Sequence, residues 1–274
     1  MTEHADSYVC GVADVPLLGI TIGRSLDHAA RRWADREALV SQSHGVRWTW
    51  KELTERVDAL AAGFLALGLE RGARIGVWSL NRPEWTLTQF AAAKAGLILV
   101  TINPAYRLSE LEFALAKVGC TALVTATAFK TSNYVEMLNT LVPELAKAQP
   151  GDLHAARLPQ LRAVIQIGGP TRPGAIPFEE VTRMGGARHQ SALATLAATL
   201  QFDDPVNIQF TSGTTGSPKG VTLTLWSSVA LAMISPASST MVFMGRLQSN
   251  APVSAAAMVR DLSNLVPGPA LQPP

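Results

Sequence analysis

The apolar residues between positions 49 and 126 follow helical and strand periodicities in alternation. Over residues 49–67 they recur at helical spacing along one face, and Gly68 follows as a natural helix terminator. Thr49 and Glu52 stand at the start of this stretch with the spacing of a capping box, in which each side chain bonds the backbone N–H of the other residue. The pattern therefore predicts an amphipathic helix here.

Two further helices are predicted downstream. Residues 83–94 begin with Pro83, which is favoured in the first turn of a helix because an N–H there would have no partner. Ser109 and Glu112 repeat the capping-box spacing, within an apolar stripe that ends at Gly119.

Short apolar runs separate these helices, as expected of buried strands: residues 75–78, 97–101, 121–125 and 162–167. Helices that alternate with short buried strands are typical of α/β proteins. We therefore expect an α/β fold in which helices flank a layered, largely parallel sheet.

Composition narrows the classes of function. Of the 274 residues, 47% are hydrophobic and 16% are charged, which excludes disorder of the whole chain. The 23 basic and 21 acidic side chains give a formal net charge of +2, too balanced for a surface that coats nucleic acid or for a polybasic membrane anchor. Two cysteines can form neither a disulfide scaffold nor a four-ligand zinc site.

The start of the chain and one apolar stretch bear on location. The first residues are acidic and lack the basic region of a secretory signal or an organelle presequence. Residues 221–245 are uncharged, but their many Ser and Thr residues and Pro236 make a poor spanning helix. We expect a cytoplasmic rather than a mitochondrial protein, with no integral membrane segment and no nucleic-acid partner.

One segment carries recognisable chemistry. Residues 206–210 and 221–225 alternate between apolar and polar side chains, so each is a predicted strand. The segment that joins them has two loop glycines at 213 and 216, four hydroxyl side chains between residues 211 and 215, and one lysine. Glycines let backbone N–H groups turn toward one point, hydroxyls add donors, and the lysine adds positive charge, as a polyphosphate site requires. The candidate ATP-binding residues are Thr211, Ser212, Gly213, Thr214, Thr215, Gly216, Ser217, Pro218 and Lys219.

This loop does not have the pattern of a Walker A loop. That pattern requires Lys directly after Gly, followed by Ser or Thr, whereas here Pro218 precedes Lys219 and Gly220 follows it. An ordinary Ser/Gly-rich hairpin loop is the simpler alternative. The order of strand and loop and the position of the lysine favour the phosphate site.

At these residues the sequence resembles the adenylate-forming superfamily, the acyl-CoA synthetases and their relatives, whose phosphate-loop signature is matched from Ile208 through Lys219. Residues 25–224 are similar to the N-terminal part of a fatty-acid–CoA ligase of the medium-chain type, so the expected fold is an incomplete N-terminal domain of such an enzyme. The upstream matches are Thr49-Trp50-Lys51-Glu52-Leu53, Asn81-Arg82-Pro83-Glu84-Trp85, Asn103-Pro104-Ala105-Tyr106-Arg107 and Glu110-Leu111.

The resemblance implies a two-step reaction. The family activates a fatty acid with Mg²⁺ and ATP to an acyl-adenylate, releases pyrophosphate, and transfers the acyl group to the thiol of coenzyme A. The loop from Thr211 to Lys219 would hold the β- and γ-phosphates, with Lys219 contributing most. No catalytic or metal-binding residue is assigned.

Other parts of the family pattern have no counterpart. No Glu follows Glu180 to serve magnesium, and no Lys follows Lys219 to serve adenylation. The last fifty residues contain only three charges, far fewer than the roughly 25% typical of a globular domain. We therefore expect a truncated or frame-shifted ligase, or an alternative product of its gene. It has three parts: an N-terminal segment (1–24), a partial adenylation domain (25–224) and a charge-poor tail unlike the family (225–274). The alternative is a non-catalytic remnant that at most binds nucleotide polyphosphate or a partner.

The remaining residues of interest favour structural roles. Cys120 lies among small apolar residues at a helix–strand junction, which indicates packing rather than reactivity. The histidines show no i,i+4 pairing that would suggest a metal site. The tryptophans are expected in the core or at its boundary.

Overall fold

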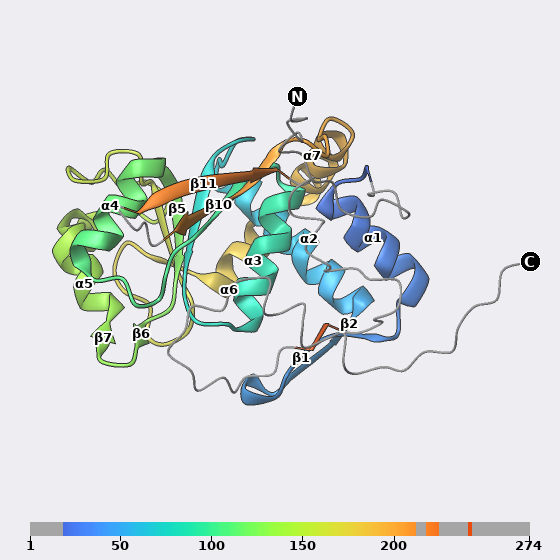
Figure 1. Cartoon of the computed structure of the whole chain (residues 1–274), viewed down its shortest axis with the longest axis horizontal. Coiled ribbons are helices and arrows are strands. Elements are labelled where there is room, and N and C mark those ends of the chain that lie inside the picture. Colours follow the sequence, from blue (N-terminus) through green and yellow to red (C-terminus); the bar gives the residue numbers. More distant parts are fainter. Residues whose placement is uncertain (1–18, 212–217, 225–240, 243–274) are drawn as a thin grey trace, which may run out of the picture.

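A mostly parallel sheet of seven strands forms the middle layer of the molecule (Figure 1). The computed structural model describes residues 19–211, 218–224 and 241–242. In chain order the elements are α1 (Ile22–Trp33), β1 (Glu37–Ser41), η1 (Gln42–His44), β2 (Val46–Thr49), α2 (Trp50–Ala66), β3 (Arg74–Trp78), α3 (Pro83–Lys94), β4 (Ile98–Thr101), α4 (Leu108–Val118), β5 (Cys120–Thr125), β6 (Ala128–Phe129), β7 (Ser132–Asn133), α5 (Tyr134–Leu141), η2 (Pro143–Lys147), β8 (Ala163–Gln166), β9 (Ile176–Pro177), α6 (Phe178–Met184), α7 (Ala187–Ala197), β10 (Pro205–Thr211), β11 (Lys219–Thr224) and β12 (Met241–Val242).

The strand order in the main sheet is β11-β10-β4-β3-β5-β8-β9, and β10–β11 is the antiparallel pair in it. Strands β1 and β2 form a separate hairpin, along which β12 pairs parallel to β1. The expectation of an α/β fold with a largely parallel sheet and flanking helices is confirmed.

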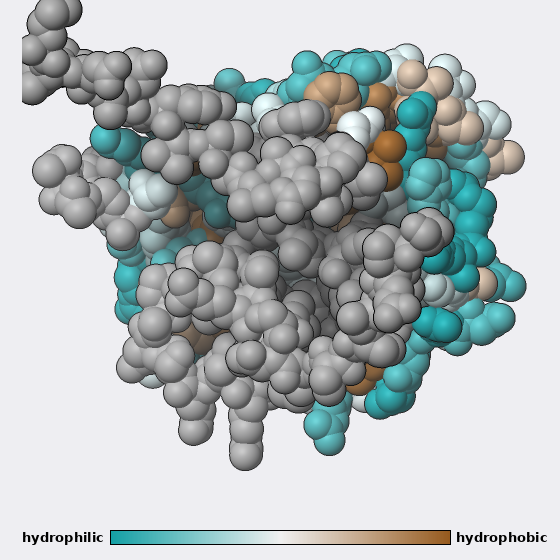
Figure 2. Space-filling model, turned by 45° about the vertical axis from the view of Figure 1, so that its right-hand side comes forward, coloured by the Kyte–Doolittle hydropathy of each residue, from teal (hydrophilic) through white to brown (hydrophobic). Residues whose placement is uncertain are grey.

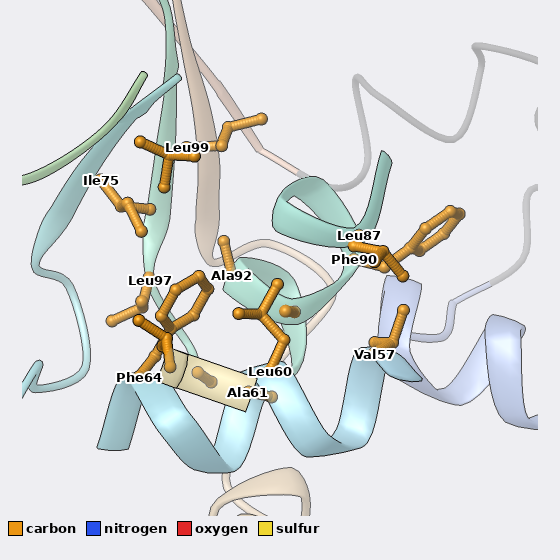
Figure 3. Close-up of a cluster of buried hydrophobic side chains, with 14 of the residues drawn as sticks. Val57, Leu60, Ala61, Phe64, Ile75, Leu87, Phe90, Ala92, Leu97 and Leu99 are labelled. Atoms are coloured by element: carbon orange, nitrogen blue, oxygen red, sulfur yellow. The ribbon is translucent and has the colours of Figure 1, made fainter. Parts of the chain in front are cut away.

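Helices cover both faces of the sheet because the strand side chains alternate between them. Ile75 and Val77 of β3 lie in a core with α1, α2, α3, α6 and α7, whereas Trp78 lies in a second core with α4 and α5. In the first core, Leu60 and Phe64 of α2 lie toward the sheet (Figure 3).

Helix α2 approaches α6 closely at a glycine. A Cβ atom added to Gly63 would lie 1.9 Å from the carbonyl oxygen of Val181. The two backbones can therefore pack at this separation only because position 63 has no side chain.

The predicted capping box of α2 is confirmed, whereas that of α4 is displaced. The Thr49 N–H donates to Glu52 Oε2 at 2.8 Å, and the Glu52 N–H donates to Thr49 Oγ1 at 3.2 Å. Helix α4 begins earlier than the Ser109–Glu112 spacing predicts, because the side chain of Glu110 accepts the N–H of Arg107 at 2.8 Å.

The surface of the described residues in Figure 2 is mainly hydrophilic, with smaller apolar areas between. Among these residues, the large apolar side chains that are exposed lie at separate positions: Leu80, Met184, Phe202 and Val221. No helix in the described ranges has the length and apolar character needed to cross a membrane. Most of the uncharged stretch 221–245, and nearly all of the predicted tail, lies outside these ranges.

Candidate functional site

The predicted strand–loop–strand segment is an antiparallel hairpin of β10 and β11. Residue Thr211 at the end of β10 is paired with Lys219 at the start of β11. Ile208 and Phe210 pack on the core formed with α4 and α5, which explains the apolar half of the alternation in β10. The structure therefore brings the first and last residues of the candidate loop side by side.

Three of the nine candidate residues can be placed. Thr211 and Lys219 are exposed, and Pro218 is half-buried just before β11. The other six lie outside the described residues: Ser212, Gly213, Thr214, Thr215, Gly216 and Ser217. Their role in gripping phosphate stays a prediction.

The loop leaves the sheet at the carboxyl ends of its parallel strands. Strand β10 runs parallel to β4, with Asn207 opposite Leu99 and Gln209 opposite Thr101. In open α/β sheets, ligands bind in the crevice outside this edge. The candidate loop thus starts where such a fold places its ligands.

The ammonium group of Lys219 faces solvent at this edge. Among the ion pairs within the described part of the chain, none involves Lys219. Its charge is therefore not neutralised by a described carboxylate, which suits a residue that meets an anionic ligand.

A stacked pair of aromatic side chains supports the neighbouring loop after β4. The rings of Trp78 and Tyr134 lie 3.5 Å apart between centroids at an interplanar angle of 13°. The Tyr134 hydroxyl donates to the carbonyl oxygen of Pro104 at 2.5 Å, and burial raises the pKa of this phenol well above its usual value. Tyr134 therefore fixes the loop that contains the Asn103–Arg107 match. The sequence alone did not reveal this contact, since nothing in the spacing of residues 78, 104 and 134 indicates it.

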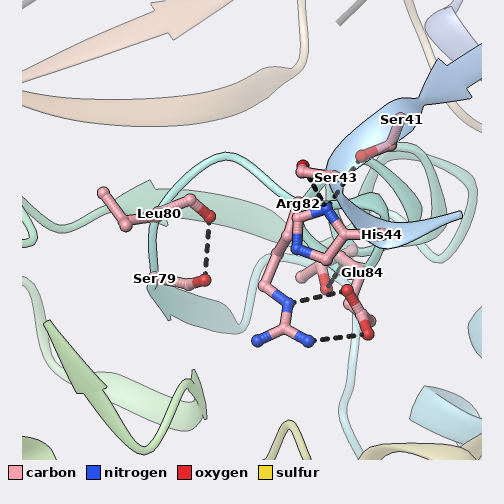
Figure 4. Close-up of polar contacts among 8 residues, drawn as sticks. Ser41, Ser43, His44, Ser79, Leu80, Arg82 and Glu84 are labelled. Carbon is pink, nitrogen blue, oxygen red and sulfur yellow. Dashed lines mark hydrogen bonds and ion pairs between the residues drawn. The ribbon is translucent and has the colours of Figure 1, made fainter. Parts of the chain in front are cut away.

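The match at residues 81–85 follows β3 and leads into α3. Arg82 donates to both carboxylate oxygens of Glu84, at 2.7 and 3.0 Å (Figure 4). The Ser79 hydroxyl donates to the carbonyl oxygen of Leu80 at 2.8 Å. Because the guanidinium of Arg82 is already paired, it organises the start of α3 rather than offering a free cation at the sheet edge.

A separate groove of about 590 Å³ lies between the β1–β2 hairpin and helices α2, α3 and α6. His44 of the β1–β2 hairpin, Trp48, Arg82 and Phe178 are among its lining residues, and the guanidinium of Arg56 lies 4.6 Å from the ring centroid of Trp48. None of the candidate phosphate-loop residues that can be placed lines this groove.

Cys120 has the packing role expected of it. Its side chain is buried, and burial raises the pKa of its thiol to about 12, so the thiol is not reactive at neutral pH and the expectation is confirmed. Across the described ranges, no three or more His, Cys, Asp or Glu residues gather closely enough to hold a metal ion.

Known proteins resemble this chain in sequence. The family model described as AMP-binding enzyme matches residues 26–251. The mitochondrial medium-chain acyl-CoA ligase ACSF2 of Danio rerio is 48% identical over 217 residues, which are 79% of this chain and 36% of the relative. Its Homo sapiens counterpart is 46% identical over 224 residues, or 81% of this chain and 36% of the relative. The chain thus spans little more than a third of the length of these relatives.

Solved structures show the same fold. One match is the inhibitor-bound N-terminal domain of FACL13 from Mycobacterium tuberculosis, with a TM-score of 0.59 and 25% sequence identity. The match covers 75% of this chain and 44% of the FACL13 chain. The long-chain-fatty-acid-CoA ligase FadD1 of Archaeoglobus fulgidus has a TM-score of 0.61 at 24% identity, over 83% and 41% of the two chains.

The relatives also correct one expectation. A cytoplasmic location is contradicted by the ACSF2 relatives at 46% to 48% identity, which are described as mitochondrial. The expectation was wrong because it relied on the first residues and on the poor spanning character of residues 221–245. A chain without a spanning helix is compatible with either compartment.

Proposed function

The chain belongs to the AMP-binding enzyme family, and from this membership we propose that it provides the polyphosphate-binding part of a fatty-acid–CoA ligase. One observation carries the proposal: a hairpin pairs Thr211 with Lys219 at the carboxyl edge of a parallel sheet, around a loop rich in glycine and hydroxyl groups. The medium-chain ligases among the relatives support a medium-chain fatty acid as the substrate.

In the proposed reaction, a carboxylate oxygen of the fatty acid attacks the α-phosphorus of ATP, and the bond to the β-phosphate oxygen breaks. The products are acyl-adenylate and pyrophosphate. The thiol of coenzyme A then attacks the acyl carbonyl, and AMP leaves. The part of this chain would be to hold the β- and γ-phosphates with backbone N–H groups, hydroxyls and Lys219, so that their charge is neutralised as pyrophosphate departs.

Magnesium that enters with ATP would supply positive charge that offsets the charge of the phosphates. The described residues do not supply a cluster of ligands for it, so no step is assigned to a metal held by them. The contribution of this chain is positioning and charge.

A second function, polyphosphate binding without turnover, is favoured by the sequence after the hairpin. The 274 residues contain no Glu after Glu180 and no Lys after Lys219, the residue types that the family resemblance assigns to magnesium and to adenylation. We therefore propose that the 274-residue chain binds polyphosphate but does not complete the synthesis of acyl-CoA.

Calorimetric titration of the 274-residue chain with ATP, GTP and tripolyphosphate tests the site. We expect all three to bind at about 1 mM, or about −4 kcal/mol, because the phosphates are recognised and the base is not. Binding should weaken with salt. Lys219→Ala should remove most of it, whereas Lys117→Ala, which removes an exposed lysine on α4, should leave it unchanged.

A pyrophosphate-release assay with fatty acids of several chain lengths tests turnover. We expect no release above the Lys219→Ala background. Turnover well above that background would show that the chain is complete enough for adenylation, and ATP binding far tighter than GTP binding would reveal a base pocket. The first result would contradict binding without turnover, and the second would contradict recognition through the phosphates alone.

A further inference from the structure

A row of basic side chains runs along the outward face of α1. Arg24, His28, Arg31 and Arg32 are all exposed. At 3.6 residues per turn, these four positions fall within about one third of the helix circumference. We call this set the basic stripe.

Neighbouring acids offset at most one of the charges of the basic stripe, because Lys94 balances one of the two carboxylates that it bonds. Asp27 is the acidic residue of α1, and the ammonium of Lys94 on α3 donates to it at 2.6 Å and to Asp58 of α2 at 2.5 Å. Among ion pairs within the described ranges, none includes the three arginines of the stripe. Beyond the helix, Asp35 and Arg36 are both exposed and offset each other.

The balanced net charge that argued against a polybasic membrane anchor is an average over the chain and does not describe this local cluster. Three arginines on one helix face exceed the formal net charge of +2 carried by all 274 residues. The outward face of α1, which lies at the right-hand edge of the domain in Figure 1, therefore carries a local excess of positive charge.

The opposite face of α1 is committed to the core. Leu26 and Ala29 are buried among residues of α2 and α3, so this apolar face is not available for insertion into a lipid bilayer. At the end of the helix, Trp33 is half-buried, and the guanidinium of Arg32 lies 5.2 Å from its ring centroid. Contact made through α1 must therefore be electrostatic and at a surface.

We propose that the basic stripe docks the protein onto an anionic lipid membrane. Arginine suits phosphate headgroups because its planar fork donates two hydrogen bonds at once. The arginines span about 12 Å along the helix axis, at 1.5 Å of rise per residue, and lie within about one third of its circumference, so all can meet a flat surface together.

Nucleic acid is the less suitable partner for this geometry. A recognition helix must project into a groove of the duplex. Helix α1 instead lies flat against α2 and α3 and presents one narrow row of side chains. A planar layer of phosphates requires no more than that row.

Vesicle cosedimentation of the 274-residue chain tests the proposal. Binding should require phosphatidylglycerol in phosphatidylcholine vesicles and should fall with added salt. Replacing all three arginines by glutamine should lower the partition coefficient roughly 100-fold, since each cation near an anionic surface raises affinity about fivefold. A triple change of Arg24, Arg31 and Arg32 to lysine should keep most of the binding.

The matched control removes equal charge from other faces: Lys117→Gln, Lys147→Gln and Arg183→Gln, all at exposed positions. It should bind vesicles like the unmodified chain, and circular dichroism should show both triple variants to be folded. Three outcomes would each overturn the proposal. They are an equal loss of vesicle binding in both triple variants, binding to vesicles of phosphatidylcholine alone, and binding to duplex DNA but not to vesicles. Lys219→Ala should still bind vesicles, so failure at the phosphate loop is distinguishable from failure here.

Discussion

The central strand β5 and the edge hairpin β10–β11 share one sheet but lie in different surroundings. In β5, which lies between β3 and β8, all positions except Thr121 are buried, whereas residues 219–222 of β11 are exposed. Among the described strands of the main sheet, β11 pairs with β10 alone. The sheet therefore derives its stability from the centre and offers its candidate chemistry at the edge, where substitutions cost less stability.

The largest expected effect is a truncation in the central strand. Leu123 of β5 is fully buried, so Leu123→Ala should lower the free energy of unfolding by about 3 kcal/mol through lost burial and the cavity left behind. Leu80→Ala, at a side chain 51% exposed, should change it by less than about 0.5 kcal/mol. Urea denaturation measures both, and equal losses would remove the distinction between interior and edge.

The next largest loss of stability is expected for a substitution at Gly63, with Gly220 as its control. Gly63→Ala should cost about 2 kcal/mol, because its Cβ would meet the Val181 carbonyl oxygen at 1.9 Å and force α2 and α6 apart. Gly220→Ala is the matched change in β11, where the nearest atom would be a side-chain methyl of Ile208 at 3.3 Å. Thermal unfolding should show a clear fall in Tm for the first variant and little change for the second.

Removal of one hydroxyl tests the support of the loop after β4. Tyr134→Phe should cost about 1 kcal/mol, the typical value of a lost hydrogen bond, because the Pro104 carbonyl loses its donor. Tyr106→Phe changes a half-buried phenol in the same loop and provides the control. If the two variants unfold at the same urea concentration, the hydroxyl of Tyr134 does not hold the loop.

The smallest effect depends on pH. Burial raises the pKa of Asp58 above its usual 3.8, and the bond to Lys94 opposes this only in part. A carboxyl with a raised pKa in the folded state contributes stability at low pH, which is lost as pH rises through that pKa. Asp58→Asn has no carboxyl group at this position, so it does not lose this stability as pH rises. The free energy of unfolding of the variant, relative to that of the unmodified chain, should therefore increase as pH rises above 3.8. The increase should be less than about 1 kcal/mol because the site is partly exposed.

A control and a contrary outcome complete that experiment. Asp203→Asn, on an exposed loop before β10, should show no such trend. A difference between Asp58→Asn and the unmodified chain that decreases over the same interval would mean that the attraction of Lys94 outweighs burial.

The sequence predicted the central part of the fold well because periodicity and burial coincide there. Residues 83–94 are helical as predicted, and the capping box at Thr49 and Glu52 fixes the start of α2. The β1–β2 hairpin and α7 were not predicted. In α7, Leu193 is the buried residue, so the helix shows little of the apolar stripe on which such predictions depend.

The candidate site was predictable only as a local motif. The alternation on each side of the loop gave both strands, and the pairing of Thr211 with Lys219 follows from them. The contacts of Tyr134 and of Lys94 join residues far apart in the chain, so they depend on tertiary packing that no local pattern records.

The stacked pair of Trp78 and Tyr134 also gives the protein an optical signal of its own. Two aromatic rings held 3.5 Å apart in a buried, asymmetric environment should contribute a distinct near-ultraviolet circular dichroism band, which requires fixed packing. Since the Tyr134 hydroxyl is bonded to Pro104, movement of the loop after β4 would disturb the ring that produces the band. The chain thus carries an intrinsic reporter beside its candidate site, readable without any added label.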